Sequence, residues 1–128
     1  MAVHDHHCPW VGACIGQRNH IYFVSYVWIT LILALFILVL DIIMITKNKD
    51  TFMVMDNENF KKLTIPQALC AAYGLIVAFL LIFLSGYHMS IVSSNQTTQE
   101  DIREKYETWG GNPYDQSLKQ NLRYFWTR

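Results

Sequence analysis

The sequence predicts an all-α membrane protein in which two transmembrane helices separate a small head, rich in cysteine and histidine, from a polar tail. Of the 128 residues, 52% are hydrophobic and 16% are charged, and the formal net charge is zero. The apolar residues are concentrated in two stretches without charge, from Ile21 to Leu40 and from Leu63 to Val92. Because about twenty helical residues span the hydrocarbon core of roughly 30 Å, each stretch is long enough to cross a bilayer.

Neither stretch has the regularly spaced polar residues of an amphipathic helix in a soluble protein. The first stretch also follows a polar segment, is too long for a secretory signal and lacks a small-residue cleavage pattern, so we expect it to remain in the mature protein. The predicted parts are a head at residues 1–20, a transmembrane helix at 21–45, a lumenal or extracellular loop at 46–64, a second transmembrane helix at 65–92 and a cytosolic tail at 93–128.

The orientation of the helices is predicted from the cysteines rather than from the basic residues. Six Lys and Arg residues lie in the terminal segments and four in the connecting loop, so the positive-inside rule does not decide. Free thiols beside histidines survive best in the reducing cytosol, which favours cytosolic termini. We expect a multi-pass integral membrane protein of the endomembrane system (Golgi or ER) or of the plasma membrane. A glycan on Asn95, in the acceptor sequence Asn95-Gln96-Thr97, would contradict this placement.

The tail contains signals for two helices. Thr97-Thr98-Gln99-Glu100 has the form of a capping box, which predicts a helix start there. We expect this helix to end at Trp109-Gly110-Gly111 and a turn to follow at Asn112-Pro113-Tyr114-Asp115. Beyond the turn, four apolar residues at helical spacing form one face, which lies on the membrane surface or packs back against the head: Leu118, Leu122, Phe125 and Trp126.

The head contains the residues best suited to catalysis, Asp5-His6-His7-Cys8. A free thiol has a pKa of about 8.5 and is mostly protonated at neutral pH, so a nucleophilic cysteine needs a base or a positive charge beside it. His6 has the chemistry of such a base if Asp5 or a backbone carbonyl holds its ring in the correct tautomer. A Cys–His pair alone is more often a buried thiol next to a polar side chain.

His7 and Cys14 have a second interpretation, as metal ligands. Both residue types bind zinc well, but a tetrahedral structural site needs four ligands, and only these two are well placed. Two residues alone are weak evidence for a zinc site. His4 and His20 are alternative further ligands, although we favour ligands upstream of Met1.

Taken together, these motifs resemble the DHHC family of protein S-acyltransferases, the palmitoyltransferases. The similarity includes Asp5-His6-His7-Cys8-Pro9-Trp10-Val11 and the spacing of the residues that follow, with five residues between Cys8 and Cys14, four between Cys14 and Asn19, and three between Asn19 and Phe23. Thr97-Thr98-Gln99-Glu100 is similar to the family's TTxE motif. Asn112-Pro113-Tyr114-Asp115 followed by Asn121 is similar to its C-terminal motif, although Gln116 and Ser117 replace the usual Leu-Gly.

The resemblance implies the transfer of a long-chain acyl group, such as palmitoyl, from acyl-CoA to protein cysteine thiols. It assigns Cys8 as the acylated nucleophile, His6 as the general base and Asp5 as its orienting partner, and it makes His7 and Cys14 ligands of one zinc ion in a partial zinc-binding head. It also implies a structural role for four motif residues, which are Thr97, Thr98, Glu100 and Asn121. The implied partners are proteins with membrane-proximal cysteines, palmitoyl-CoA and the lipid bilayer, and no nucleic acid.

Two further site predictions concern the substrate. The resemblance places Phe23 at the mouth of the acyl-chain cavity, and helical spacing adds Tyr26 or Val27, Thr30 and Leu33 as an acyl groove, although helix packing explains these residues almost as well. Arg18 has the charge to attract the phosphates of CoA, and it equally suits an anchor at the lipid headgroups.

The departures from the family pattern concern the length of the chain. Family members have four transmembrane helices, whereas this sequence has the last two, and further zinc ligands would fall before Met1. We therefore expect an N-terminally truncated member. Two alternatives remain open: a catalytically inactive membrane adaptor or zinc-binding fragment, and a thioesterase that uses the same Cys–His pair.

Overall fold

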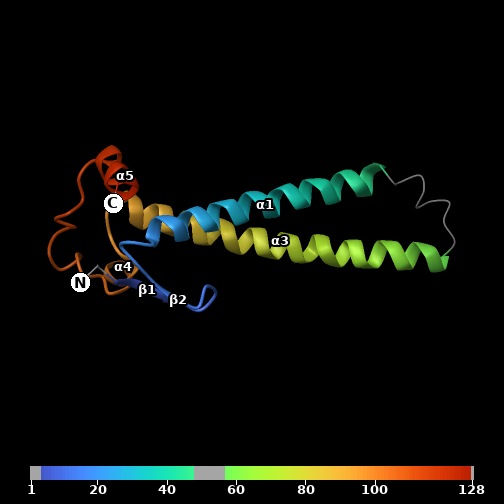
Figure 1. Ribbon diagram of the computed structural model, residues 1–128, viewed down its shortest axis with the longest axis horizontal. Helices are drawn as coiled ribbons and strands as arrows, with labels where there is room; N and C mark the ends of the chain where they lie inside the picture. The colour runs from blue at the N-terminus through green and yellow to red at the C-terminus, as the bar shows by residue number, and fades with distance from the viewer. Residues whose placement is uncertain (1–3, 48–56, 128) are drawn as a thin grey trace. The chain divides into compact units, whose positions relative to one another are not determined.

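The computed structural model describes residues 4–47 and 57–127, with only the backbone of residues 57–64. The elements in chain order are β1 (His4–Cys8), β2 (Ala13–Gly16), α1 (His20–Lys47), α3 (Asn57–Ser93), α4 (Thr98–Ile102) and α5 (Leu118–Trp126) (Figure 1). The chain divides into two compact units, and we describe each by itself. The first unit comprises Met1–Val27 and Leu84–Arg128, and the second comprises Trp28–Phe83.

The head is a β-hairpin, so the all-α prediction is wrong in this part of a mostly helical chain. β1 pairs with β2 in antiparallel register, with His7 opposite Cys14 and an irregularity between His4 and His6. The hairpin turns through Pro9 and Gly12, where the Gly12 amide donates to the Pro9 carbonyl and Gly12 has a φ of 62° that favours glycine. The polar strand residues lack the regular apolar alternation that identifies a strand in a sequence.

Among the described residues, two helices are long and apolar enough to cross a membrane, at His20–Lys47 and Ile65–Ser93. The second belongs to α3, which begins at Asn57 and so differs from the prediction that residues 46–64 form a loop. Hydropathy marks where a helix leaves the hydrocarbon, not where it ends. Glu and Lys are favourable helix formers, and they extend α3 into the polar segment.

The second unit consists of parts of α1 and α3 with few buried side chains. Leu31, Leu38 and Ala78 are buried, whereas most other large apolar side chains of this unit are exposed. A Cβ atom added at Gly74 would lie 3.1 Å from Cδ2 of Leu38, so glycine allows a close approach of the two helices there. The exposed apolar surface has the character expected of a surface in contact with lipid chains.

Defined capping motifs end α3 and begin α4 in the first unit. α3 ends in a Schellman motif, in which Gln96 N–H donates to the Ile91 carbonyl over 2.9 Å and Asn95 has a φ of 50°. Thr97 then caps α4, and its reciprocal hydrogen bonds with Glu100 confirm the predicted capping box.

The prediction that the helix at Thr98 continues to Trp109 is wrong, because α4 already ends at Ile102. Glu104 has a φ of 50°, and Lys105 N–H donates to the Glu100 carbonyl over 3.1 Å, which is again the Schellman pattern. The reversal brings the hydroxyl of Tyr106 to within 2.7 Å of Glu100 Oε1 and buries Tyr106. These contacts outweigh the local preference for a longer helix.

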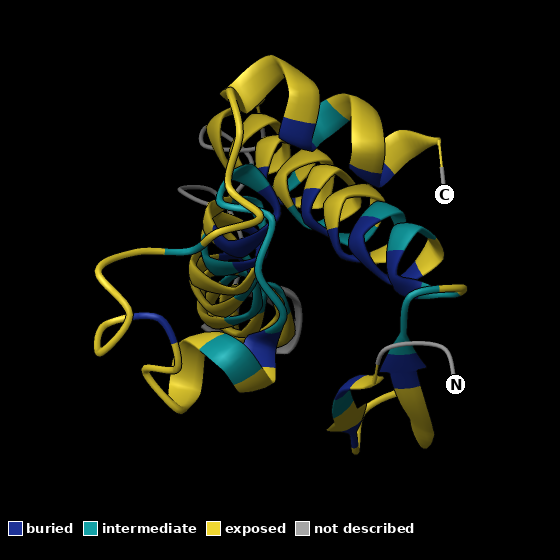
Figure 2. Ribbon diagram, turned by 90° about the vertical axis from the view of Figure 1, so that its left-hand side faces the viewer, coloured by how far each residue is buried: buried dark blue, intermediate teal, exposed yellow. Residues whose placement is uncertain are grey.

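The predicted C-terminal helix is present as α5, but its packed face differs from the prediction. Its two buried residues are Asn121 and Phe125, which share one face of the helix because they are four positions apart. Figure 2 colours buried positions dark blue. Leu118 and Trp126 are exposed. Asn121 belongs to the buried side because its amide has hydrogen-bond partners there, which a pattern of apolar residues does not reveal.

Candidate functional site

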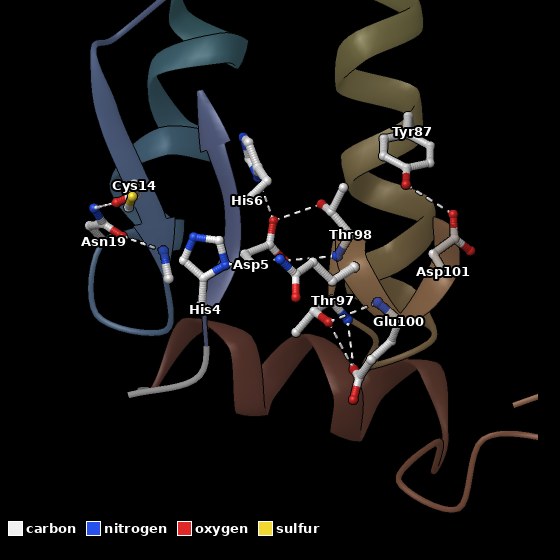
Figure 3. Close-up of polar contacts among 12 residues, drawn as sticks. His4, Asp5, His6, Cys14, Asn19, Tyr87, Thr97, Thr98, Glu100 and Asp101 are labelled. Atoms are coloured by element: carbon white, nitrogen blue, oxygen red, sulfur yellow. Dashed lines mark hydrogen bonds and ion pairs between the residues drawn. The ribbon is translucent and has the colours of Figure 1, made fainter. Parts of the chain in front are cut away.

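Asp5 lies at the centre of a buried hydrogen-bond network that joins β1 to α4 (Figure 3). Its Oδ1 accepts from the backbone N–H of Thr98 over 2.9 Å, and its Oδ2 accepts from the Thr98 hydroxyl over 2.6 Å. The same Oδ2 lies 2.6 Å from Nδ1 of His6. Burial raises the pKa of Asp5, but the hydrogen bonds from Thr98 and His6 outweigh this effect and hold the pKa below its ordinary value.

This network sets the tautomer of His6. An ionised carboxylate only accepts hydrogen bonds, so Nδ1 of His6 is the donor to Asp5. In the neutral imidazole, Nε2 then carries the free lone pair. His6 therefore has the arrangement that a general base requires.

Cys8 is buried and not in a disulfide, and it follows His6 by two positions in β1. Residues two apart in a strand point to the same face of the sheet, so the thiol and the imidazole lie on one side of the hairpin. No hydrogen bond joins Cys8 to His6 within the part of the chain that the structure describes. Catalytic hydrogen bonds are often long in a ligand-free protein and shorten in the substrate complex.

The first turn of α4 fixes Thr98, the partner of Asp5. Oε2 of Glu100 accepts from the backbone N–H and hydroxyl of Thr97, while its Oε1 accepts from Lys105 and Tyr106. Burial raises the pKa of Glu100, but the hydrogen bonds from Tyr106, Lys105 and Thr97 lower it to about 2. The ionised Glu100 thus stabilises the helix start whose next residue contacts Asp5.

His7 and Cys14 face each other on the exposed side of the hairpin. Nδ1 of His7 lies 3.5 Å from Sγ of Cys14. A nitrogen and a sulfur on one tetrahedral zinc ion, at about 2.0 and 2.3 Å from the metal, are also roughly 3.5 Å apart. Among the described residues, no group of three or more His, Cys, Asp or Glu side chains has a metal-binding arrangement. The pair therefore fits two of the four ligands of one zinc ion.

A cluster of imidazole and phenyl rings lies against His6. The ring centroid of His6 is 5.2 Å from Phe23 and 5.6 Å from His88, and Phe23 lies 4.9 Å from His88. His20 joins the cluster at 5.7 Å from His88 and 5.3 Å from Phe125. His88 did not emerge from the sequence as a site residue. The available signal was its position as an ionisable residue inside an apolar span.

The predicted acyl-groove residues follow one another along α1 and differ in how far they are buried. Phe23 and the alternative residue Val27 are buried, whereas Tyr26 and Leu33 are 57% and 54% exposed. Thr30 is half-buried. Arg18, the predicted contact for CoA phosphates, is exposed ahead of α1.

Asn121 connects the C-terminal segment to the end of α3 by hydrogen bonds. The amide is almost fully buried, with 1% of its surface exposed. Its Nδ2 donates to the Ser93 carbonyl over 2.7 Å and to Oδ1 of Asp115 over 2.6 Å, while its Oδ1 accepts from Gln116 N–H over 3.2 Å. Every hydrogen-bonding group of the amide side chain is thereby engaged.

The site combines a buried thiol, an imidazole oriented by an ionised carboxylate and two helices of membrane-spanning length, which defines a membrane protein with a candidate cysteine nucleophile. The family model of the DHHC palmitoyltransferases matches residues 1–105, and the chain therefore belongs to this family.

Curated relatives support this assignment. The chain is 33% identical to the probable protein S-acyltransferase 6 of Arabidopsis thaliana over 119 residues, which are 93% of this chain and 28% of that protein. It is 34% identical to the palmitoyltransferase ZDHHC9 of Danio rerio over 86% of this chain and 28% of that protein. It is 35% identical to the human palmitoyltransferase ZDHHC14 over 86% of this chain and 23% of that protein. The chain thus spans about a quarter of the length of these relatives.

Proposed function

We propose that this chain provides the reacting centre of a protein S-acyltransferase, which transfers a long-chain acyl group, such as palmitoyl, from acyl-CoA to protein cysteines through a thioester on Cys8. The observation that supports this proposal most directly is the 2.6 Å contact between Nδ1 of His6 and Oδ2 of Asp5, two strand positions from the buried thiol. Membership of the DHHC family and the names of the relatives support the same activity.

The proposed reaction consists of two thioester exchanges. Nε2 of His6 takes the thiol proton of Cys8, and the sulfur attacks the thioester carbonyl carbon of acyl-CoA. The bond between that carbon and the CoA sulfur breaks, and the CoA thiolate takes the proton from His6. An acceptor cysteine of a protein substrate then repeats the exchange, receives the acyl group and regenerates the Cys8 thiol.

The proximity of the site to a membrane span suits a lipid substrate. Each buried methylene contributes about 0.8 kcal/mol, so the acyl chain prefers the hydrocarbon core while its thioester reaches the interface. Phe23, in the first turn of α1, contacts the His6 ring and is placed to meet the chain near its thioester. Tyr26, Thr30 and Leu33 continue along α1 as proposed acyl contacts, and Arg18 is the proposed contact of the CoA phosphates.

Labelling with a clickable palmitoyl-CoA analogue tests the proposal in the zinc-loaded protein reconstituted in lipid vesicles. We expect hydroxylamine-sensitive label on Cys8, transfer of the label to an acceptor protein, and no label in Cys8→Ser. Cys70→Ala is the matched control, since Cys70 is an exposed free cysteine of α3, and it should label normally. Absence of label on Cys8 would favour an inactive adaptor, and rapid turnover without an acceptor would favour a hydrolase.

We further propose that His7 and Cys14 hold one structural zinc ion together with ligands outside the described residues. When bound, zinc would cross-link β1 and β2 and make the hairpin rigid. Cys14→Ala should lower the zinc content measured by atomic absorption and increase proteolysis of the head, whereas Cys70→Ala should retain the metal. Stoichiometric zinc in Cys14→Ala would remove this residue from the ligand set.

We also propose that both termini are cytosolic in a multi-pass protein of the endomembrane system or plasma membrane, with the segment between the two spans on the lumenal or extracellular side. The proposed substrates are proteins whose cysteines lie close to the bilayer. Nδ2 of Asn95 is the atom that a lumenal glycan would modify. In the structure it donates a hydrogen bond to the Tyr114 carbonyl over 2.9 Å, which supports an unglycosylated Asn95 on the cytosolic side. A mass shift on glycosidase treatment that maps to Asn95 would reverse this orientation.

A further inference from the structure

His88 is a buried polar residue whose local contacts do not explain its polarity. It lies in the C-terminal part of α3 with 3% of its surface exposed. Its Nδ1 is buried without a hydrogen-bond partner among the described residues. An unpaired buried nitrogen is destabilising, whereas a phenylalanine would fill similar space without that loss. The described residues therefore leave this imidazole nitrogen able to accept a further partner.

The neighbours of His88 indicate what that partner is. Its ring lies 5.6 Å from that of His6, the proposed base, and 4.9 Å from that of Phe23, the proposed contact of the acyl chain. An acyl-CoA that reacts with Cys8 has its thioester beside His6 and its chain beside Phe23. The carbonyl oxygen of that thioester is attached to the carbon where the chain begins, so such a substrate would bring this oxygen next to His88.

We propose that the neutral imidazole of His88 donates a hydrogen bond to the thioester carbonyl oxygen and stabilises the oxyanion that develops there. This inference rests on the proposed acyl transfer. When the Cys8 sulfur bonds to the carbonyl carbon, the C=O π electrons move to the oxygen, which then accepts more strongly from the His88 N–H. On collapse, the carbonyl reforms, the bond to the CoA sulfur breaks, and the CoA thiolate takes the proton from His6. His88 keeps its proton throughout.

Replacement of His88 by phenylalanine tests the donor while it preserves the ring packing. In the zinc-loaded protein in vesicles, quenched-flow measurements of Cys8 acylation by palmitoyl-CoA should show a maximal rate reduced by about 10²–10³-fold for His88→Phe. The concentration of palmitoyl-CoA for half-maximal rate should change little, because the interaction strengthens in the transition state. His88→Asn, which retains an amide donor, should recover part of the rate.

Alkylation of Cys8 by iodoacetamide provides the decisive control, because this displacement forms no oxyanion at a carbonyl. Quantified by mass spectrometry of the Cys8 peptide, alkylation should proceed at the native rate in His88→Phe and more slowly in His6→Ala. Equal slowing of alkylation and acylation in His88→Phe would overturn the inference, since His88 would then act through His6. Native acylation in His88→Phe would overturn it too.

Two further outcomes separate folding and function. If His88→Phe fails to fold, as judged by its thermal unfolding, His88→Ala and His88→Asn replace it, and equal acylation rates in this pair contradict a donor role. If the native protein alkylates normally at Cys8 but never acylates, the proposed function itself fails, and the role of His88 fails with it.

Discussion

Replacement of His6 by alanine should slow acylation of Cys8 by about 10²–10⁴-fold, the usual contribution of a positioned general base. The reason is that Asp5 fixes Nδ1 of His6 as a donor over 2.6 Å, which leaves Nε2 to accept the thiol proton. Without this imidazole, the thiol of Cys8 loses its proposed proton acceptor. Quenched-flow labelling with palmitoyl-CoA measures the acylation rate of Cys8. Insertion of His6→Ala into vesicles should be unchanged.

His4→Ala is the matched control for this prediction. His4 begins the same strand, is exposed, and has its Nδ1 3.2 Å from the side-chain Nε2 of Gln99. Its replacement should leave acylation within about twofold of the native rate, since an exposed polar contact of this kind contributes little. An acylation rate in His6→Ala equal to that of His4→Ala would remove His6 from the role of base.

Those features that depend on local sequence were predictable. The two apolar spans, the capping box at Thr97 and the C-terminal helix each follow from consecutive or regularly spaced residues within one segment of the sequence. The pairing of Asp5 with His6 is also local, because the two residues are adjacent. In each of these cases the interacting groups are close in sequence, so spacing and residue type are sufficient.

Features that depend on contacts outside any regular spacing pattern were not predictable in the same way. α4 ends early because Tyr106 and Lys105 fold back onto Glu100, and Asn121 is buried because Ser93, 28 positions earlier, offers its carbonyl. The head hairpin likewise depends on pairing between two short strands without apolar alternation. No periodicity in the sequence encodes these contacts.

The candidate site also contains residues that the sequence identified and residues that it did not. The sequence identified Asp5, His6 and Cys8 but not His88. The rings of His6 and His88 are in contact, but the two residues are 82 positions apart in the sequence (88 − 6). The partner of Asp5 was also assigned only as a motif residue. Thr98 was expected within a helix cap, whereas both its backbone and its hydroxyl donate to Asp5 across 93 positions.

Asp5→Asn should affect both the stability of the first unit and acylation of Cys8. Oδ2 of Asp5 accepts from His6 Nδ1 and from the Thr98 hydroxyl over 2.6 Å each, whereas an asparagine NH₂ group at that position cannot accept either. Hydrogen bonds to a charged group contribute about 1.5–3 kcal/mol, so we expect a loss of roughly 2–3 kcal/mol in the free energy of unfolding. His6 also loses the acceptor that fixes its tautomer, so acylation should fall by about 10²–10⁴-fold.

Thr98→Val separates the two effects, because it removes only the hydroxyl and keeps the backbone donor to Asp5. It should destabilise the unit by about 1 kcal/mol and reduce acylation much less than Asp5→Asn does. Because the folded-state pKa of Asp5 lies below its ordinary value, its stabilisation is present above pH of about 4 and is lost as the pH falls through the lowered pKa. Thermal unfolding against pH should therefore be flatter in this range for Asp5→Asn than for Thr98→Val. If the two variants lose acylation equally, Asp5 acts as a tether to α4, and the orientation of His6 depends on something else.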